Sequence, residues 1–137
     1  MKVIPFLLAS SLSLANLGPN WTFERQGLSA ILSDPAVDGS PLRLSCAQQQ
    51  GYLEINILSG SKPEVTLVAP SKIRLTLRGE LSPDGRITSN VYFKSLTVEF
   101  LREEGEVEVL GGRTYRLHLD GARRVIDTLE SSCLAVT

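Results

Sequence analysis

The chain has 137 residues, of which 42% are hydrophobic, 21% charged and 6% aromatic. This composition predicts one globular domain and excludes a disordered tail, a collagen-like repeat and a multidomain assembly. Basic and acidic residues nearly balance, at 14 and 15, so no cationic surplus argues for a nucleic-acid partner. One histidine and two distant cysteines are too few ligands for a zinc site, so we expect no metal and no other cofactor.

The N-terminus has the features of a secretory signal peptide covering residues 1–15. Lys2 supplies the positive charge, residues 3–14 form a largely apolar run, and Ala15 is a small residue suited to cleavage. The run is shorter than the roughly 20 apolar residues that a membrane-spanning helix needs. We therefore expect cleavage near Ala15, no integral membrane segment, and a single β-rich domain at residues 16–137, either periplasmic or secreted.

Alternation of apolar and polar residues, interrupted by turn-forming residues, predicts a series of short β-strands. In chain order they cover residues 21–23, 29–33, 42–46, 52–58, 65–68, 73–77, 87–93, 107–109 and 115–119. Gly, Pro, Asp and Gln predict turns at 48–51, 82–85 and 111–112. Residues 94–104 fit a helix by apolar spacing and a strand by propensity, and we favour a short helix ending at Gly105.

The final segment changes from the two-residue period of a strand to the period of an α-helix. One face of that helix would carry Ala122, Val125, Ile126, Leu129 and Cys133. Such a face packs on a sheet. The predicted fold is therefore mainly β: a small β-sandwich or open barrel of seven to nine short strands with one C-terminal helix.

Both cysteines, Cys46 and Cys133, lie in the predicted mature chain. Because export delivers the chain to an oxidising compartment and the count is even, we predict a structural disulfide between them. The C-terminal helix would bring Cys133 back to the strand that holds Cys46. The alternatives are two buried thiols or a redox pair, although redox pairs usually have the Cys-x-x-Cys spacing, which this sequence lacks.

Three features together point to one group of proteins. An export signal precedes Trp21, a strand reads Leu-Arg-Leu-Ser-Cys-Ala at 42–47, and the chain ends with Tyr-Arg-Leu-His-Leu-Asp-Gly at 115–121, a helix and Cys133. This arrangement resembles small proteobacterial periplasmic proteins, among them the VasI-type proteins associated with type VI secretion. The resemblance implies a β-rich, disulfide-tied periplasmic domain of accessory role, and it carries over no catalytic residues. The turn at 120–123 is more polar than the usual turn of that group.

Two groups of residues are candidates for a catalytic site: His118, and the pair Glu106 and Glu108. A hydrolase would have to use His118, which we place on the strand face opposite Tyr115, with no Gly-x-Ser-x-Gly motif to present a nucleophile; we expect a solvated surface histidine. Glu106 and Glu108 would lie about 6 to 7 Å apart along one strand face. That spacing suits glycoside hydrolysis only with a cleft and a raised pKa. We favour a charged face that protects the strand edge, and we expect no catalytic site.

Two groups of residues are candidates for partner binding. Arg123 and Arg124 lie in the first turn of the predicted helix, where cations oppose the helix dipole. They either pair with Asp127 and Asp120, or bind an anionic partner at the helix N-terminus. The second group is the loop formed by Ser59, Gly60, Ser61 and Lys62, which is otherwise an ordinary connection.

These observations predict an exported periplasmic accessory or binding protein without catalytic activity, with a role in secretion or envelope assembly. Its partner would be a periplasmic or envelope protein; the oligomeric state is left open. The alternative is a periplasmic inhibitor or immunity protein that inserts the loop at 59–62 into the cleft of a lysozyme-type cell-wall hydrolase.

Overall fold

The computed structural model describes residues 20–37, 39–46 and 51–134. The predicted signal peptide, its cleavage near Ala15, and most of the predicted turn at 48–51 lie outside these residues. The domain boundaries predicted at 1–15 and 16–137 stay predictions. In the described part the chain is mainly β, which confirms the predicted fold class.

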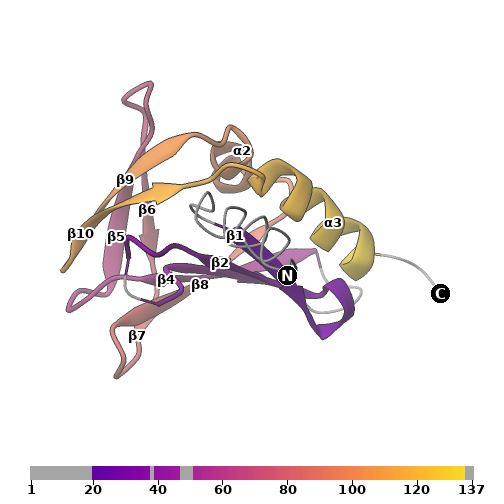
Figure 1. Ribbon diagram of the computed structural model, residues 1–137, viewed down its shortest axis with the longest axis horizontal. Helices are drawn as coiled ribbons and strands as arrows, with labels where there is room; N and C mark the ends of the chain where they lie inside the picture. The colour runs from indigo at the N-terminus through magenta and orange to yellow at the C-terminus, as the bar shows by residue number, and fades with distance from the viewer. Residues whose placement is uncertain (1–19, 38, 47–50, 135–137) are drawn as a thin grey trace, which may run out of the picture.

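In the described residues, ten strands form two antiparallel sheets that do not close into a barrel (Figure 1). The first sheet has the order β1-β2-β3-β4-β8-β7 and the second the order β10-β9-β5-β6. The strand bounds are β1 Asn20–Glu24, β2 Ser29–Ser33, β3 Leu42–Ser45, β4 Tyr52–Leu58, β5 Glu64–Val68, β6 Arg74–Arg78, β7 Glu80–Leu81, β8 Arg86–Tyr92, β9 Glu106–Leu110 and β10 Thr114–His118.

At one of its crossings between the two sheets, the chain passes from β6 in the second sheet to β7 in the first. Gly79 is the residue between them, and a Cβ atom there would collide with the backbone carbonyl of Thr88. Only glycine fits this crossing. The two-residue strand β7 that follows is the one the sequence did not predict, because alternation is not detectable over so few residues. With β7, the described residues form ten strands, one more than the upper limit of the predicted seven to nine.

The segment at 94–104 forms a short helix, α2 (Leu96–Arg102), as favoured from the sequence. Ser95 decides the ambiguity, since its hydroxyl accepts a hydrogen bond at 3.3 Å from the backbone N–H of Val98 and so caps the helix. The strand-favouring residues Thr97 and Val98 are thereby held in helical conformation against their propensity.

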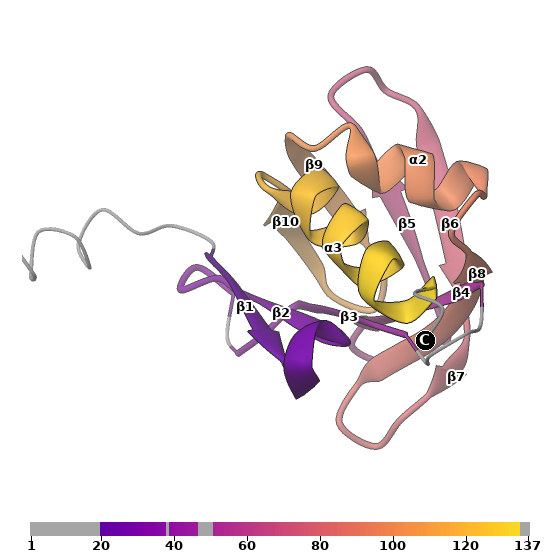
Figure 2. The same cartoon turned by 90° about the vertical axis from the view of Figure 1, so that its right-hand side faces the viewer.

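The C-terminal helix α3 (Ala122–Leu134) buries the apolar face that the sequence predicts, made of Ala122, Val125, Ile126, Leu129 and Cys133. Helices α2 and α3 lie side by side over the opening between the two sheets (Figure 2). Their buried residues join one core with the inward side chains of both sheets, among them Leu44, Ile55, Leu67 and Leu117.

The predicted disulfide between Cys46 and Cys133 is formed and fastens the last turn of α3 to the end of β3. It joins residues 87 positions apart, and their Cα atoms are 6.2 Å apart, within the range that a disulfide spans. The bond is consistent with an oxidising, extracytoplasmic location.

The first sheet has two unlike sides. Its inner side carries the buried apolar residues and faces both α-helices (Figures 1 and 2). The outer side, here called the open face, carries polar and aromatic side chains that the strand pairing places in neighbouring rows. These residues include Arg43, Ser45, Tyr52, Glu54, Asn56, Thr88, Asn90 and Tyr92.

Candidate functional site

The loop predicted for partner binding is tied to two other turns. The backbone N–H groups of Ser59 and Gly60 both donate to the carbonyl of Gly85 at 2.8 Å, and the carbonyl of Ser59 accepts from the N–H of Arg113 at 2.9 Å. Ser59 is fully buried, whereas the tip Ser61–Lys62 is exposed. The exposed tip is therefore the part most available to a partner, and the hydrogen bonds of Ser59 and Gly60 hold the base of the loop in place.

Arg123 and Arg124 are exposed in the first turn of α3, beside a shallow depression that Glu104 and Asp127 also line. Neither arginine forms an ion pair with a described residue. The backbone N–H of Arg123 donates to Oε2 of Glu104 at 3.0 Å. A carboxylate of the chain itself therefore already occupies the helix N-terminus, where one of the two alternatives from the sequence placed an external anion.

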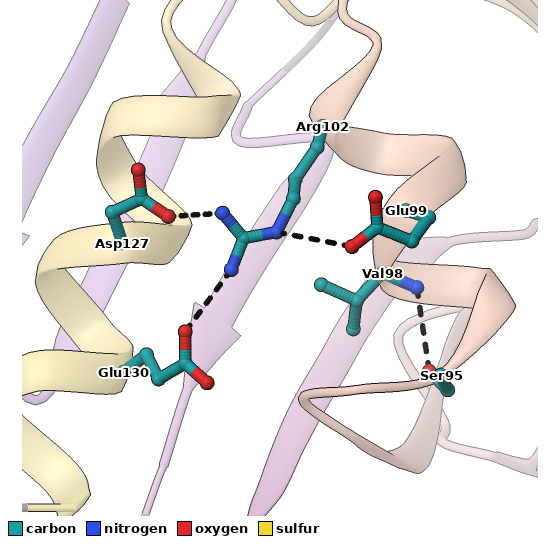
Figure 3. Close-up of polar contacts among 6 residues, drawn as sticks. All are labelled: Ser95, Val98, Glu99, Arg102, Asp127 and Glu130. Carbon is teal, nitrogen blue, oxygen red and sulfur yellow. Dashed lines mark hydrogen bonds and ion pairs between the residues drawn. The ribbon is translucent and has the colours of Figure 1, made fainter.

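Asp127, the expected partner of Arg123, instead contacts Arg102 at the end of α2 (Figure 3). The Arg102 guanidinium also donates to Glu130 at 3.1 Å and lies 3.7 Å from Glu99. Its side chain is only 13% exposed. Desolvation lowers the pKa of Arg102, but the hydrogen bond and charge of Asp127, with the charges of Glu130 and Glu99, outweigh this and raise the pKa. We call this group the Arg102 clamp; it holds α2 to α3.

His118 is not the solvated surface histidine expected from the sequence. Its Nε2 atom lies 2.7 Å from Oε2 of Glu106, and its Nδ1 atom lies 3.3 Å from Oδ2 of Asp34. Asp34 is 4% exposed and comes from the β2–β3 connection. The histidine is half-buried because this connection reaches the edge strand β10. His118 thus links the two sheets, and each of its ring nitrogens lies next to a carboxylate.

Glu106 and Glu108 both point outward from β9, as predicted for a charged strand face. A hydrogen bond from Arg116 at 2.7 Å is the largest cause of a lowered pKa of Glu106. The charge of Arg116 and the hydrogen bond and charge of His118 act in the same direction, while desolvation opposes them. A general acid for glycoside cleavage needs a raised pKa, so this carboxyl is shifted the wrong way.

An exposed aromatic patch lies at one end of the open face. Tyr52 on β4 and Tyr92 on β8 are directly paired, with ring centroids 4.6 Å apart and hydroxyl oxygens 3.1 Å apart. The hydrogen bond that Tyr52 shares with Tyr92, followed by the charge of Tyr92, raises the pKa of Tyr52. Leu96 follows Tyr92 after one tight turn and begins α2. We call Tyr52, Tyr92 and Leu96 the aromatic patch.

Sequence reasoning did not single out the aromatic patch or the Arg102 clamp. The two tyrosines are 40 positions apart and become neighbours only through the register of β4 and β8. Asp127 and Glu130 are spaced for one helix face, which was the single available signal for the clamp. That spacing does not identify Arg102 as the residue with which Asp127 and Glu130 both pair.

Within residues 20–37, 39–46 and 51–134, no helix is long and apolar enough to cross a membrane. Over the same residues, no group of three or more histidine, cysteine, aspartate or glutamate side chains has the arrangement of a metal site.

Comparison with protein-family models, with curated proteins and with solved structures gave no match to this chain. The likeness to VasI-type proteins therefore rests on the residues quoted above alone.

Proposed function

We propose that this protein is an exported periplasmic accessory protein that acts by binding a protein of the cell envelope, without catalysis. The observation that carries the proposal is the aromatic patch. The side chains of Tyr52, Tyr92 and Leu96 are 42%, 60% and 87% exposed. Large apolar and aromatic side chains that are exposed at the end of a strand pair and on the helix that follows it are typical of protein interfaces.

The patch has the properties of a binding anchor. Tyrosine contributes large contact area with few rotatable bonds, so little side-chain entropy is lost when it docks. Stacking and the hydroxyl contact already hold Tyr52 and Tyr92 in one arrangement, which reduces that loss further. Leu96 would supply the apolar group that fills a pocket on the partner.

The non-catalytic part of the proposal is supported by the state of the titratable groups. Both ring nitrogens of His118 face carboxylates, and the pKa of Glu106 is lowered rather than raised. The disulfide supports the extracytoplasmic part. The resemblance to VasI-type proteins makes a secretion-associated envelope protein the first partner to look for.

A second candidate function is inhibition of a lysozyme-type cell-wall hydrolase through the loop at 59–62. One observation favours it: the loop is held by backbone hydrogen bonds from both neighbouring turns, so its exposed tip is preorganised. Preorganised loops lose little entropy on entering a cleft.

Site-specific photo-crosslinking in cells distinguishes the surfaces. A photo-reactive amino acid is placed at position 96, 62 or 123, and at position 73 as the control. Ile73 is a matched control, since it is an apolar side chain 57% exposed and belongs to none of the proposed surfaces.

We expect position 96 to give one dominant crosslink to an envelope protein, which Tyr92→Ser abolishes while the fold stays intact. A crosslink from position 62 to a cell-wall hydrolase, with none from 96, would replace the proposal by the inhibitor function. Equal crosslinking from 96 and 73, unaffected by Tyr92→Ser, would contradict the aromatic patch as the binding surface.

A further inference from the structure

A second site lies on the open face, toward the edge formed by β1. It is a cavity of about 340 Å³ whose lining contains no apolar side chain. We call it the arginine–glutamate pocket, and it is lined by Glu24, Arg25, Ser29, Arg43, Ser45, Glu54 and Asn56. Its volume lies at the lower end of the range for small-molecule sites.

The backbone beside the pocket is strained. Arg25 and Gln26 have φ angles of 55° and 59°, in the left-handed region, and Gly27 follows at 88°. Such conformations are unfavourable for residues with a side chain and cluster at functional sites. Here they form the turn η1 (Arg25–Gly27) between β1 and β2, which places Glu24 and Arg25 in the pocket lining.

The charges in the pocket are not engaged with one another. Of Glu24, Arg25, Arg43 and Glu54, none forms an ion pair with a described residue, although all four line one cavity. Among the described residues, the one side-chain hydrogen bond between two residues of the lining is from the Ser45 hydroxyl to Oε1 of Glu54, at 3.0 Å. Cations and anions that share a cavity without pairing leave their hydrogen-bonding groups free for a ligand.

Groups behind the pocket strengthen its positive side. Asn56 accepts a hydrogen bond from Nε of Arg86, and the second terminal nitrogen of Arg86 is buried with no hydrogen-bond partner among the described residues. Burial, and next the charge of Arg43, lower the pKa of Arg86. Two guanidinium groups are thus near enough to repel each other, and an anion bound at Arg43 relieves that repulsion. Ser29, only 3% exposed, adds a buried hydroxyl to the lining.

The lining selects the ligand. Guanidinium groups bind carboxylates through paired hydrogen bonds, and the carboxylates of Glu24 and Glu54 suit an ammonium group. A phosphate dianion would be repelled by the two glutamates, and an apolar ligand would desolvate all seven residues. We propose that the pocket binds a free amino acid, with its carboxylate on Arg25 and Arg43 and its ammonium group on Glu24 and Glu54. This proposal is independent of the protein partner at the aromatic patch.

The test is a heteronuclear NMR titration of the oxidised protein with a panel of free L- and D-amino acids. We expect at least one to shift the backbone amides of the pocket residues saturably, with a Kd on the order of 1 mM or tighter. Its C-terminal amide and its N-acetyl derivative, which each lack one charge, should bind about tenfold or more weakly.

Variants assign the two charges. Arg43→Gln should weaken the amino acid about tenfold or more but leave the weak binding of the amide nearly unchanged. Glu54→Gln should weaken binding of the amino acid by a similar factor but leave the weak binding of the N-acetyl derivative nearly unchanged. Arg74→Gln and Glu108→Gln, which remove exposed charges of the other sheet, are the matched controls and should bind as the wild type does.

Three results would overturn the proposal. The first is no saturable shift at the pocket amides with any amino acid of the panel. The second is equal affinity for the amino acid, its amide and its N-acetyl derivative. The third is unchanged binding in a folded Arg43→Gln variant, with folding checked by the dispersion of its NMR spectrum.

Discussion

The Arg102 clamp and the arginine–glutamate pocket contain the same residue types and use them in opposite ways. Arg102 is 13% exposed and has three carboxylates within 4 Å. Arg43 is exposed on the open face and has no ion pair with a described residue. The clamp binds two helices to each other with its charges, whereas the pocket leaves its charges available.

Solvation explains the difference. A guanidinium as deeply placed as that of Arg102 loses most of its hydration, so the fold tolerates it only with partners that restore the lost interactions. Water can solvate Arg43 and Glu54 at no comparable cost, so the fold does not require them to pair. Paired charges on the helix side therefore contribute to stability, and unpaired charges on the open face are available for recognition.

The largest expected effect is loss of the disulfide that fastens the helix side. Cys46→Ala with Cys133→Ala should lower the free energy of unfolding by about 2–5 kcal/mol, because the unfolded chain is no longer cross-linked. Urea unfolding of the oxidised and double-variant proteins measures it. A loss well under 1 kcal/mol would show that packing of α3 alone is sufficient.

The Arg102 clamp should have the next largest effect. Arg102→Gln leaves three carboxylates around a neutral side chain, and we expect a loss of about 1–2 kcal/mol after allowing for the partial exposure of Asp127 and Glu99. Arg116→Gln is the matched control: Arg116 also pairs with a carboxylate, but it is 68% exposed and should cost under about 1 kcal/mol. Equal losses in the two variants would remove the distinction between buried and exposed pairs.

Glu106 predicts a smaller, pH-dependent effect. Its pKa is lowered in the folded protein, so the charged form stabilises the fold above the pKa of the unfolded chain, and this contribution is lost as the pH falls through the folded pKa. Wild type should be more stable than Glu106→Gln at pH 7, and the two should converge below about pH 4. Thermal unfolding of both proteins across this pH range measures the effect. A stability difference between wild type and Glu106→Gln that grows as the pH falls would contradict the prediction.

The pocket charges should contribute least to stability. Arg43→Gln and Glu54→Gln remove exposed groups with no ion pair among the described residues, so each should change the free energy of unfolding by less than about 0.5 kcal/mol. Urea unfolding of both variants checks this. A loss of unfolding free energy comparable to that of Arg102→Gln would mean that the pocket charges are structural. The Arg102 clamp and the pocket would then not differ in how they use their charges.

The features that could be predicted from the sequence are those carried by local patterns. Strand β3, strand β4 and the buried face of α3 follow from alternation or helical spacing within a few residues. The disulfide could be predicted because the sequence has two cysteines and the predicted export signal implies an oxidising compartment.

The features that could not be predicted depend on contacts between distant segments. His118 and Asp34 are 84 positions apart, and Arg102 and Glu130 are 28 apart, so no local pattern relates them. The left-handed backbone at Arg25 has no composition signal either, because arginine ordinarily avoids it. The arginine–glutamate pocket depends on that turn and on the register of β3 and β4, and so it appears only in the folded protein.

Thermal unfolding with and without the best-binding amino acid tests most directly whether the charges on the helix side are structural and those on the open face bind a ligand. We predict that the amino acid raises the Tm of the wild type and, by a similar increment, that of the less stable Arg102→Gln variant. It should leave the Tm of Arg43→Gln unchanged. An increment that is lost in Arg102→Gln and retained in Arg43→Gln would contradict the account.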